Sequence, residues 1–264
     1  MNLGISTSCF YPLETEVSLE TIGKNGVKTA EIFFNAQSEL KNSFVDMLCD
    51  IKEEYGITIS SIHPTMSLAE SFVFFSNYER RFYEGLESYR RYSEIAATLG
   101  AKYIILHGGK PNGILSDEEY CERYMQIKEA TKQNGITVLQ ENVFKHRAGD
   151  IEFLRSIKNI LGHNAEFCFD VKQAIRCGYD PIETIKELSS NIKHYHISDH
   201  SVASDCLLPL NGNFNFEELF KYLKSINYNG SLITEVYNNA YKNYTEIFNS
   251  FEKLKKIKEW ILCF

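Results

Sequence analysis

Paired cysteines, long hydrophobic runs and an excess of basic charge are all missing from this 264-residue sequence. Its seven cysteines are scattered, odd in number and include no C-x-x-C motif, so neither a disulfide framework nor a zinc–cysteine site is expected. The uncharged stretches fall short of the roughly 20 residues that a membrane-spanning helix needs, and the first residues do not resemble a secretory signal. We therefore expect a cytoplasmic protein with reduced thiols and no membrane segment.

Basic residues are outnumbered by acidic ones. The sequence contains 28 Lys and Arg residues and 35 Asp and Glu residues, which gives a formal net charge of -7. Such a charge repels a phosphate polyanion unless the basic groups gather on one face, so a nucleic-acid partner is not expected. Aromatic residues make up 13% of the chain, which leaves a homo-oligomer possible.

Short apolar runs alternate with amphipathic stretches along the whole sequence, and neither a low-complexity segment nor a Pro/Ser-rich linker interrupts them. Eight of the runs are predicted to be strands: 2–7, 28–34, 57–63, 102–108, 136–142, 166–171, 193–199 and 231–237. Helical periodicity is clear between them, at 38–56, 77–100, 116–135 and 180–190.

Residues typical of helix ends support these predicted helices. Ser116 with Glu119 fits a capping box. Gly56, Gly100 and Gly135 stand where left-handed helix ends are expected.

Eight strand and helix repeats predict an α/β fold, a single-domain (β/α)₈ TIM barrel over residues 1–264. A doubly wound open sheet is the alternative. It would usually carry a Gly-rich phosphate-binding turn after the first strand, and residues 6–12, STSCFYP, provide none.

Four polar side chains each close one of the apolar runs: Glu141, Asp170, His196 and Glu235. Because an unpaired buried charge costs several kcal/mol, four of them suggest a shared partner such as a metal ion. In a barrel the carboxyl ends of the strands meet at one mouth, and alternate residues point inward. The alternation of inward and outward residues then places the four at this mouth.

Carboxylate oxygens with one imidazole suit one divalent metal ion, which the sequence leaves open as Mn²⁺, Co²⁺, Zn²⁺ or Mg²⁺. Such an ion can polarise a carbonyl and stabilise an enediolate, while flanking carboxylates move the proton. Two histidines at the ends of earlier strands, His63 and His107, would join the same mouth.

The segments QENVFKHR, CFDVKQA, KHYHISDH, PLNGNFNF and LITEVY, in this order, resemble the strand ends of the xylose-isomerase-like TIM-barrel superfamily. That superfamily contains sugar and sugar-phosphate isomerases, ketose 3-epimerases, inosose dehydratase and endonuclease IV. The resemblance implies that Glu141, Asp170, His196 and Glu235 are metal ligands. It also implies that Glu141 and Glu235 are the catalytic pair that transfers the proton.

Departures from the family's pattern narrow the expected function. The family's D-x-x-H after strand six reads Asp170-Val171-Lys172-Gln173 here, and D-x-H after strand seven is matched only by Asp205-Cys206-Leu207. Loss of both histidines argues against a three-zinc nuclease. The segment 199–220 contains no Lys or Arg, which favours a neutral sugar over a phosphate ester.

We therefore expect a metal-dependent isomerase or epimerase of a small sugar, sugar phosphate or related hydroxy-ketone. The alternatives are a metal-dependent dehydratase of a polyol or keto-inositol, an endonuclease IV-like abasic-site hydrolase, and a non-catalytic sugar-binding barrel. Five further side chains are expected to contact the substrate: His63, His107, Lys172, Gln173 and Arg147.

Overall fold

Eight short strands form the centre of the computed structural model, which describes residues 1–263. They are β1 (Asn2–Ser6), β2 (Thr29–Phe33), β3 (Thr58–His63), β4 (Tyr103–Leu106), β5 (Thr137–Glu141), β6 (Phe167–Asp170), β7 (Ile192–Ile197) and β8 (Ser231–Thr234). All neighbouring strands are parallel and follow one another in chain order, and β8 pairs with β1 to close the barrel. The single-domain TIM barrel is therefore confirmed, and each strand lies on its predicted run except that β7 begins one residue earlier, at Ile192.

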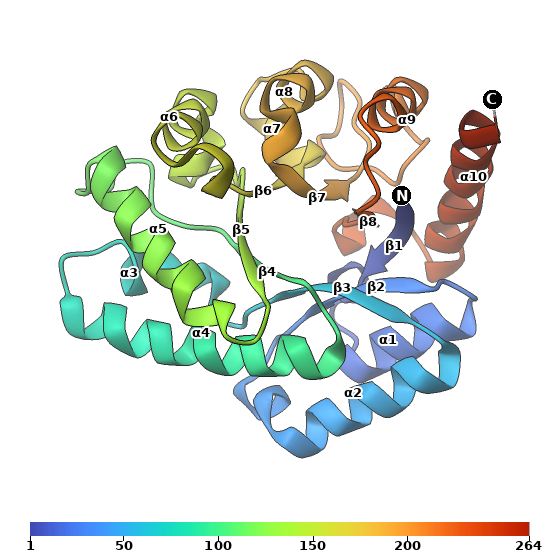
Figure 1. Cartoon of the computed structure of the whole chain (residues 1–264). Coiled ribbons are helices and arrows are strands. Elements are labelled where there is room, and N and C mark those ends of the chain that lie inside the picture. Colours follow the sequence, from blue (N-terminus) through green and yellow to red (C-terminus); the bar gives the residue numbers. More distant parts are fainter. Residues whose placement is uncertain (264) are drawn as a thin grey trace.

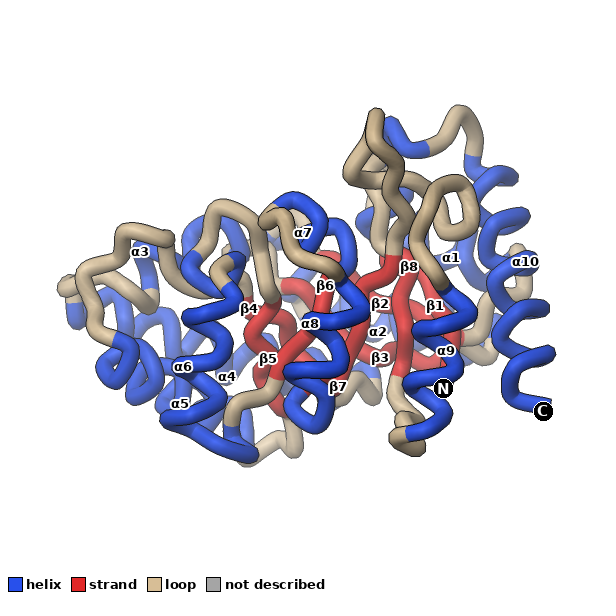
Figure 2. The backbone as a smooth tube through the Cα atoms, turned by 90° about the horizontal axis from the view of Figure 1, so that it is seen from above, coloured by secondary structure: helices blue, strands red, loops and turns tan. Residues whose placement is uncertain are grey.

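Helices surround this barrel, as Figure 1 shows, and Figure 2 shows them on both sides of the strands. They are α1 (Thr15–Lys24), α2 (Asn42–Tyr55), α3 (Glu70–Val73), α4 (Glu79–Leu99), α5 (Asp117–Lys132), α6 (Ile151–Leu161), α7 (Val171–Arg176), α8 (Pro181–Leu188), α9 (Phe216–Ser225) and α10 (Tyr244–Cys263). Short 3-10 turns lie at Thr7–Phe10, Gln37–Leu40, Ser67–Ala69, Arg147–Gly149, Gly162–Asn164, Ser189–Asn191 and Asn238–Ala240. Within residues 1–263, no helix has the length and apolar character needed to cross a bilayer.

Three of the four predicted helix-end signals are confirmed, whereas Gly135, with φ of 71°, lies beyond α5, which already ends at Lys132. Helix α5 begins with both bonds of the capping box, from Glu119 N to Ser116 Oγ (3.2 Å) and from Ser116 N to Glu119 Oε2 (2.7 Å). Gly56 and Gly100 end α2 and α4 with φ of 61° and 77°. A residue with a Cβ is strained at such angles, so glycine here stops the helix and turns the chain toward the next strand.

Two layers of apolar packing hold the barrel. The larger one lies between the strands and the helices and includes fully buried residues such as Ile104, Val138 and Phe169. The smaller one is formed by Ile105, Leu139 and Cys168. Alternation along a strand sends neighbouring residues to opposite faces, so this smaller cluster fills the barrel interior. Glu141, two residues beyond Leu139 on β5, therefore lies on the inward face, as the alternation predicts.

Candidate metal centre

The four predicted ligands converge at the carboxyl ends of four consecutive strands. Glu141 ends β5, Asp170 ends β6, His196 lies near the end of β7, and Glu235 directly follows β8. One potential ligand atom from each lies within 4.8 Å of those from the other three. We name these residues the four-ligand group. Glu235 keeps 15% of its side chain exposed whereas His196 is fully buried, so the group opens toward solvent on the Glu235 side.

His196 stands at the centre of this group. Its Nδ1 lies 2.9 Å from Glu141 Oε1, 3.5 Å from Glu235 Oε2 and 4.0 Å from Asp170 Oδ2. A divalent ion with ligand bonds of about 2.0–2.2 Å fits among atoms with these separations. Three carboxylates and one imidazole are also the donors that such an ion prefers over softer thiolate sites. The residues therefore fit a divalent metal ion.

The carboxylates of the group are ionised at neutral pH. Burial raises the pKa of Asp170 to about 6. Burial acts in the same direction on Glu141, but hydrogen bonds from two imidazoles outweigh it and hold its pKa well below the usual range. Burial would also raise the pKa of Glu235, but the positive charges of Lys172 and His196 together outweigh it and lower that pKa. Three negative charges therefore meet at the barrel mouth.

Lys172 supplies a buried cation beside these charges. Its Nζ lies 2.7 Å from Asp170 Oδ2 and 2.9 Å from Glu235 Oε2. Burial would lower the pKa of this lysine, but the two carboxylates raise it well above its usual value. Asp170 also caps α7, because its Oδ1 accepts the backbone N–H of Gln173 at 2.9 Å. The start of α7 thus holds the ligand and the lysine together.

Both predicted mouth histidines lie beside the four-ligand group. His107 Nε2 is 3.2 Å from Glu141 Oε2. The ring of His63 lies 5.3 Å from that of His107 and stacks on Phe33 at 4.9 Å. Neither ring nitrogen of His63 has a hydrogen-bond partner, although its Nε2 lies 3.7 Å from Glu31 Oε1. The structure therefore brings these two histidines to the predicted site.

Gln173 lies at the rim of the site. Its Oε1 accepts the backbone N–H of Phe144 at 3.0 Å. It lines a cavity of about 700 Å³ together with His107 and Tyr237. The side-chain amide therefore borders a space that a substrate can enter.

Arg147, in contrast, is held away from the four-ligand group. Its guanidinium forms an ion pair with Asp117 and donates a hydrogen bond to the carbonyl of Leu115. It also lies over the ring of Phe153, 4.5 Å from the centroid. This arginine therefore joins the start of α5 to α6, and the structure does not bring it to the other predicted substrate contacts.

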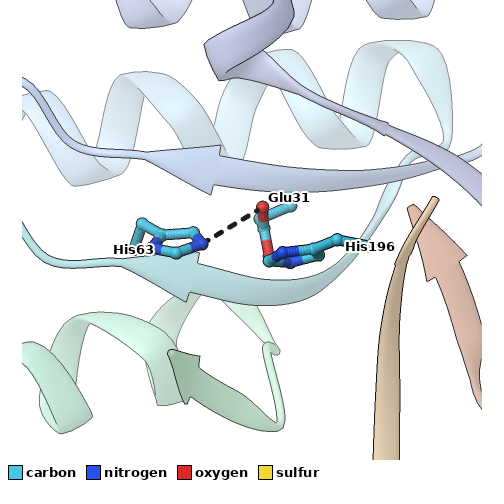
Figure 3. Close-up of side chains that lie close together, drawn as sticks. All are labelled: Glu31, His63 and His196. Carbon is cyan, nitrogen blue, oxygen red and sulfur yellow. Dashed lines mark hydrogen bonds and ion pairs between the residues drawn. The ribbon is translucent and has the colours of Figure 1, made fainter. Parts of the chain in front are cut away.

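Sequence reasoning missed Glu31, a carboxylate with no exposed surface in the middle of β2. Figure 3 shows it between the imidazole rings of His63 and His196. Its Oε2 lies 3.0 Å from His196 Nε2 and accepts the Ser61 hydroxyl at 2.7 Å. Burial alone would raise the pKa of Glu31, but the neighbouring imidazoles, His196 first, hold it well below the usual range.

A signal for Glu31 was present in the sequence. Glu31 is the single acidic residue within the apolar run 28–34, KTAEIFF. Because it stands inside the strand rather than at its end, a search for polar strand ends passes over it. His194 lies at the same depth, with Nε2 3.0 Å from Ser61 Oγ and 3.6 Å from Glu31 Oε2.

A second cavity, of about 310 Å³, reaches the group from the side of Glu235 and Lys172. Its other lining residues are Ser8, Tyr11, Phe33, Asn35, Val236, Tyr237 and Asn238. Tyr237 also lines the larger cavity. The two cavities therefore adjoin at this tyrosine and give a small molecule access to the four-ligand group.

Known proteins share this architecture. A D-tagatose 3-epimerase-like protein is 25% identical, with a TM-score of 0.81 over 99% of this chain and 98% of that chain. The fold is also that of the IOLI protein with a binding zinc atom (19% identity, TM-score 0.78, 99% of both chains). It is shared by an AP endonuclease, family 2, from Brucella melitensis (18%, 0.77, 97% of this chain and 99% of that one). Residues 19–260 match the family model of the xylose isomerase-like TIM barrel, and the chain belongs to that family.

Proposed function

We propose that this protein is a cytoplasmic, divalent-metal-dependent isomerase or epimerase that acts on a small sugar or a related hydroxy-ketone. The observation that carries the proposal is the four-ligand group, in which two ionised glutamates, Glu141 and Glu235, approach one buried imidazole from different strands. Similarity to a D-tagatose 3-epimerase-like protein supports the same reaction class.

Glu141, Asp170, His196 and Glu235 would hold the ion, as Mn²⁺, Co²⁺, Zn²⁺ or Mg²⁺. When bound, a divalent ion supplies Lewis-acid stabilisation of the negative charge that develops on substrate oxygens. The remaining chemistry belongs to the protein's own side chains, and it is a proton transfer at the carbon next to the substrate carbonyl.

Glu235 is the carboxylate that faces the smaller cavity, and its lowered pKa keeps it ready to accept a proton. In the proposed reaction a Glu235 oxygen takes the proton from carbon. Glu141, which lies beside His107 and His196, relays a proton from water to the same or the neighbouring carbon, and Glu235 afterwards releases its proton to water. Return to the same carbon gives epimerisation, and return to the neighbouring carbon gives isomerisation. No net proton is gained or lost.

The smaller cavity favours a neutral sugar as substrate. Tyr11, Phe33 and Tyr237 offer aromatic faces, and Asn35 and Asn238 offer amides that can hydrogen-bond hydroxyl groups. Lys172 is the one cation among the residues that line this cavity, and two carboxylates already bind it. A phosphate group would have to compete with those carboxylates for the ammonium.

The test combines metal content with turnover. Wild-type protein prepared with added metal should retain about one ion per chain by elemental mass spectrometry. A panel of ketoses should then identify a substrate whose reaction in D₂O places deuterium on carbon. Glu141→Gln and Glu235→Gln should each lower turnover by about 10²–10⁴-fold, whereas Glu217→Gln, at an exposed ion pair of α9, should not.

Two results would defeat the proposal: no retained metal after supplementation, or near-normal turnover in both glutamine variants. A product lighter than the substrate by one water would instead establish the dehydratase. Lys172 gives that alternative some support, because an ammonium 2.9 Å from Glu235 is placed to protonate a departing hydroxyl. Nicking of an abasic duplex would establish the hydrolase.

A further inference from the structure

The nitrogen of His196 that faces away from the four-ligand group has a partner of its own. Nδ1 faces three carboxylates, whereas Nε2 lies 3.0 Å from Glu31 Oε2. An imidazole nitrogen that binds a metal ion carries no proton, so a neutral ring then has its proton on the other nitrogen. In that form His196 Nε2 donates its hydrogen bond to Glu31.

Glu31 is held in place for this contact. The Ser61 hydroxyl donates to the same Oε2 at 2.7 Å, and the strand fixes the backbone on both sides. β2 and β7 are not neighbours in the barrel, so the contact between Glu31 and His196 crosses the barrel interior. Figure 3 shows the carboxylate pointing between the two imidazole rings.

Burying a carboxylate in a barrel interior costs more free energy than burying an apolar side chain there. Its described partners are a hydroxyl and imidazoles, without a lysine or an arginine among them, and its Oε1 has no hydrogen-bond partner. Removing such a charge from water costs several kcal/mol unless strong partners compensate for it. Apolar packing would fill the same volume at lower cost, so the fold alone does not account for Glu31.

We propose that Glu31 is a positioning residue for the metal centre. By accepting the hydrogen bond from His196 Nε2, it fixes the tautomer and the orientation of the ring, so that Nδ1 stays directed at the other three ligands. A carboxylate behind a histidine ligand also makes that ligand more basic, and loss of such a partner typically lowers metal affinity about 10–100-fold. The inference rests on the proposed function, because it requires an ion in the four-ligand group.

A different role for the same residues is a second ion held directly by Glu31, His63 and His196, whose potential ligand atoms lie within 4.8 Å of one another. That role requires both nitrogens of His196 to be unprotonated at once. The distance of 3.0 Å between His196 Nε2 and Glu31 Oε2 is that of an ordinary hydrogen bond. The geometry therefore favours positioning over direct ligation.

Glu31→Gln tests the inference in the full-length protein. Co²⁺ is titrated by calorimetry, which gives the dissociation constant and the number of ions, and the visible absorption of the bound Co²⁺ reports its ligand field. The variant should bind Co²⁺ about 10–100-fold more weakly, with the number of ions unchanged and the absorption bands shifted.

Two controls separate positioning from general loss of structure. Ser61→Ala removes the other hydrogen bond to Glu31 and leaves the His196 contact intact. Glu70→Gln neutralises another fully buried glutamate, whose carboxylate is bound by Tyr89 and by the backbone N–H groups of residues 107 and 108. Glu70→Gln should bind Co²⁺ as the wild type does, even where thermal unfolding shows that it is less stable. Ser61→Ala, which loosens Glu31 without removing it, should weaken Co²⁺ binding less than Glu31→Gln does.

The outcomes are distinct. If Glu31→Gln binds Co²⁺ with wild-type affinity and spectrum, the inference is wrong while the proposed function stands. Two ions in the wild type and one in Glu31→Gln would show Glu31 to be a ligand and would also overturn positioning. A wild-type protein that binds no Co²⁺ would overturn the proposed function, and the inference with it.

Discussion

At the scale of single residues, the barrel mouth balances several buried charges against one another. Four carboxylates, those of Glu31 and of the four-ligand group, lie around one imidazole, and within residues 1–263 Lys172 is the one ammonium that contacts them. Such a cluster is stable only when each charge keeps a partner. Changes to single charges here should therefore have opposite effects on stability and on metal binding.

Lys172→Met should destabilise the metal-free protein by about 3–5 kcal/mol, because Asp170 and Glu235 lose the buried cation between them. The same change should strengthen Mn²⁺ binding, since the ion then meets less compensated negative charge. Urea unfolding with chelator and with excess Mn²⁺ measures both effects. Lys186→Met, at an exposed pair on α8, is the control. Equal loss of stability in both conditions would contradict the prediction.

The convergence of the four-ligand group could be predicted from the sequence because each member stands at a strand end, and strand ends meet in a barrel. Glu31 could not be assigned in this way, since its role depends on which side chains meet across the barrel interior. Arg147 was misleading for another reason. It follows β5 closely in the chain, but its direction is set by Asp117 at the start of α5.

At the scale of elements, the site depends on where strands stop and helices start. Asp170 is both the last residue of β6 and the cap of α7, so one carboxylate serves the helix and the four-ligand group. Helix α5 is also capped by a side chain, although that side chain is not part of the four-ligand group. Its capping box can be recognised from the sequence alone. Local signals of this kind placed the helix ends well, whereas they carry no information on contacts between elements.

Ser116→Ala should lower the free energy of unfolding by about 1 kcal/mol, because the first turn of α5 loses its side-chain cap. Ser88→Ala is a matched control, since Ser88 lies within α4 and only bonds back to a carbonyl of its own helix. Chemical denaturation of the two variants measures the difference. Equal stability of the two variants would argue against the capping box as a stabilising element.

At the scale of the whole molecule, binding of the proposed metal ion would be linked to folding. An ion bound by side chains from β5, β6, β7 and β8 binds the folded barrel and not the unfolded chain.

Metal removal should therefore lower the melting temperature. At about 100 times its dissociation constant, an ion adds about 2.7 kcal/mol of stability, which corresponds to about 5–10 °C for a domain of this size. Scanning calorimetry with chelator and with excess Mn²⁺ measures the shift. Glu235→Gln should show a smaller shift, and a wild type insensitive to chelator would speak against a tightly bound ion.

The pairing of β8 with β1 has a consequence for the order of assembly. The four proposed ligands lie within residues 141–235, so all of them belong to the second half of the chain. Glu31 belongs to β2 in the first half of the chain, so its contact with His196 of β7 requires both halves of the barrel. Closure of the barrel would then bring Glu31 to His196 and complete the proposed metal centre.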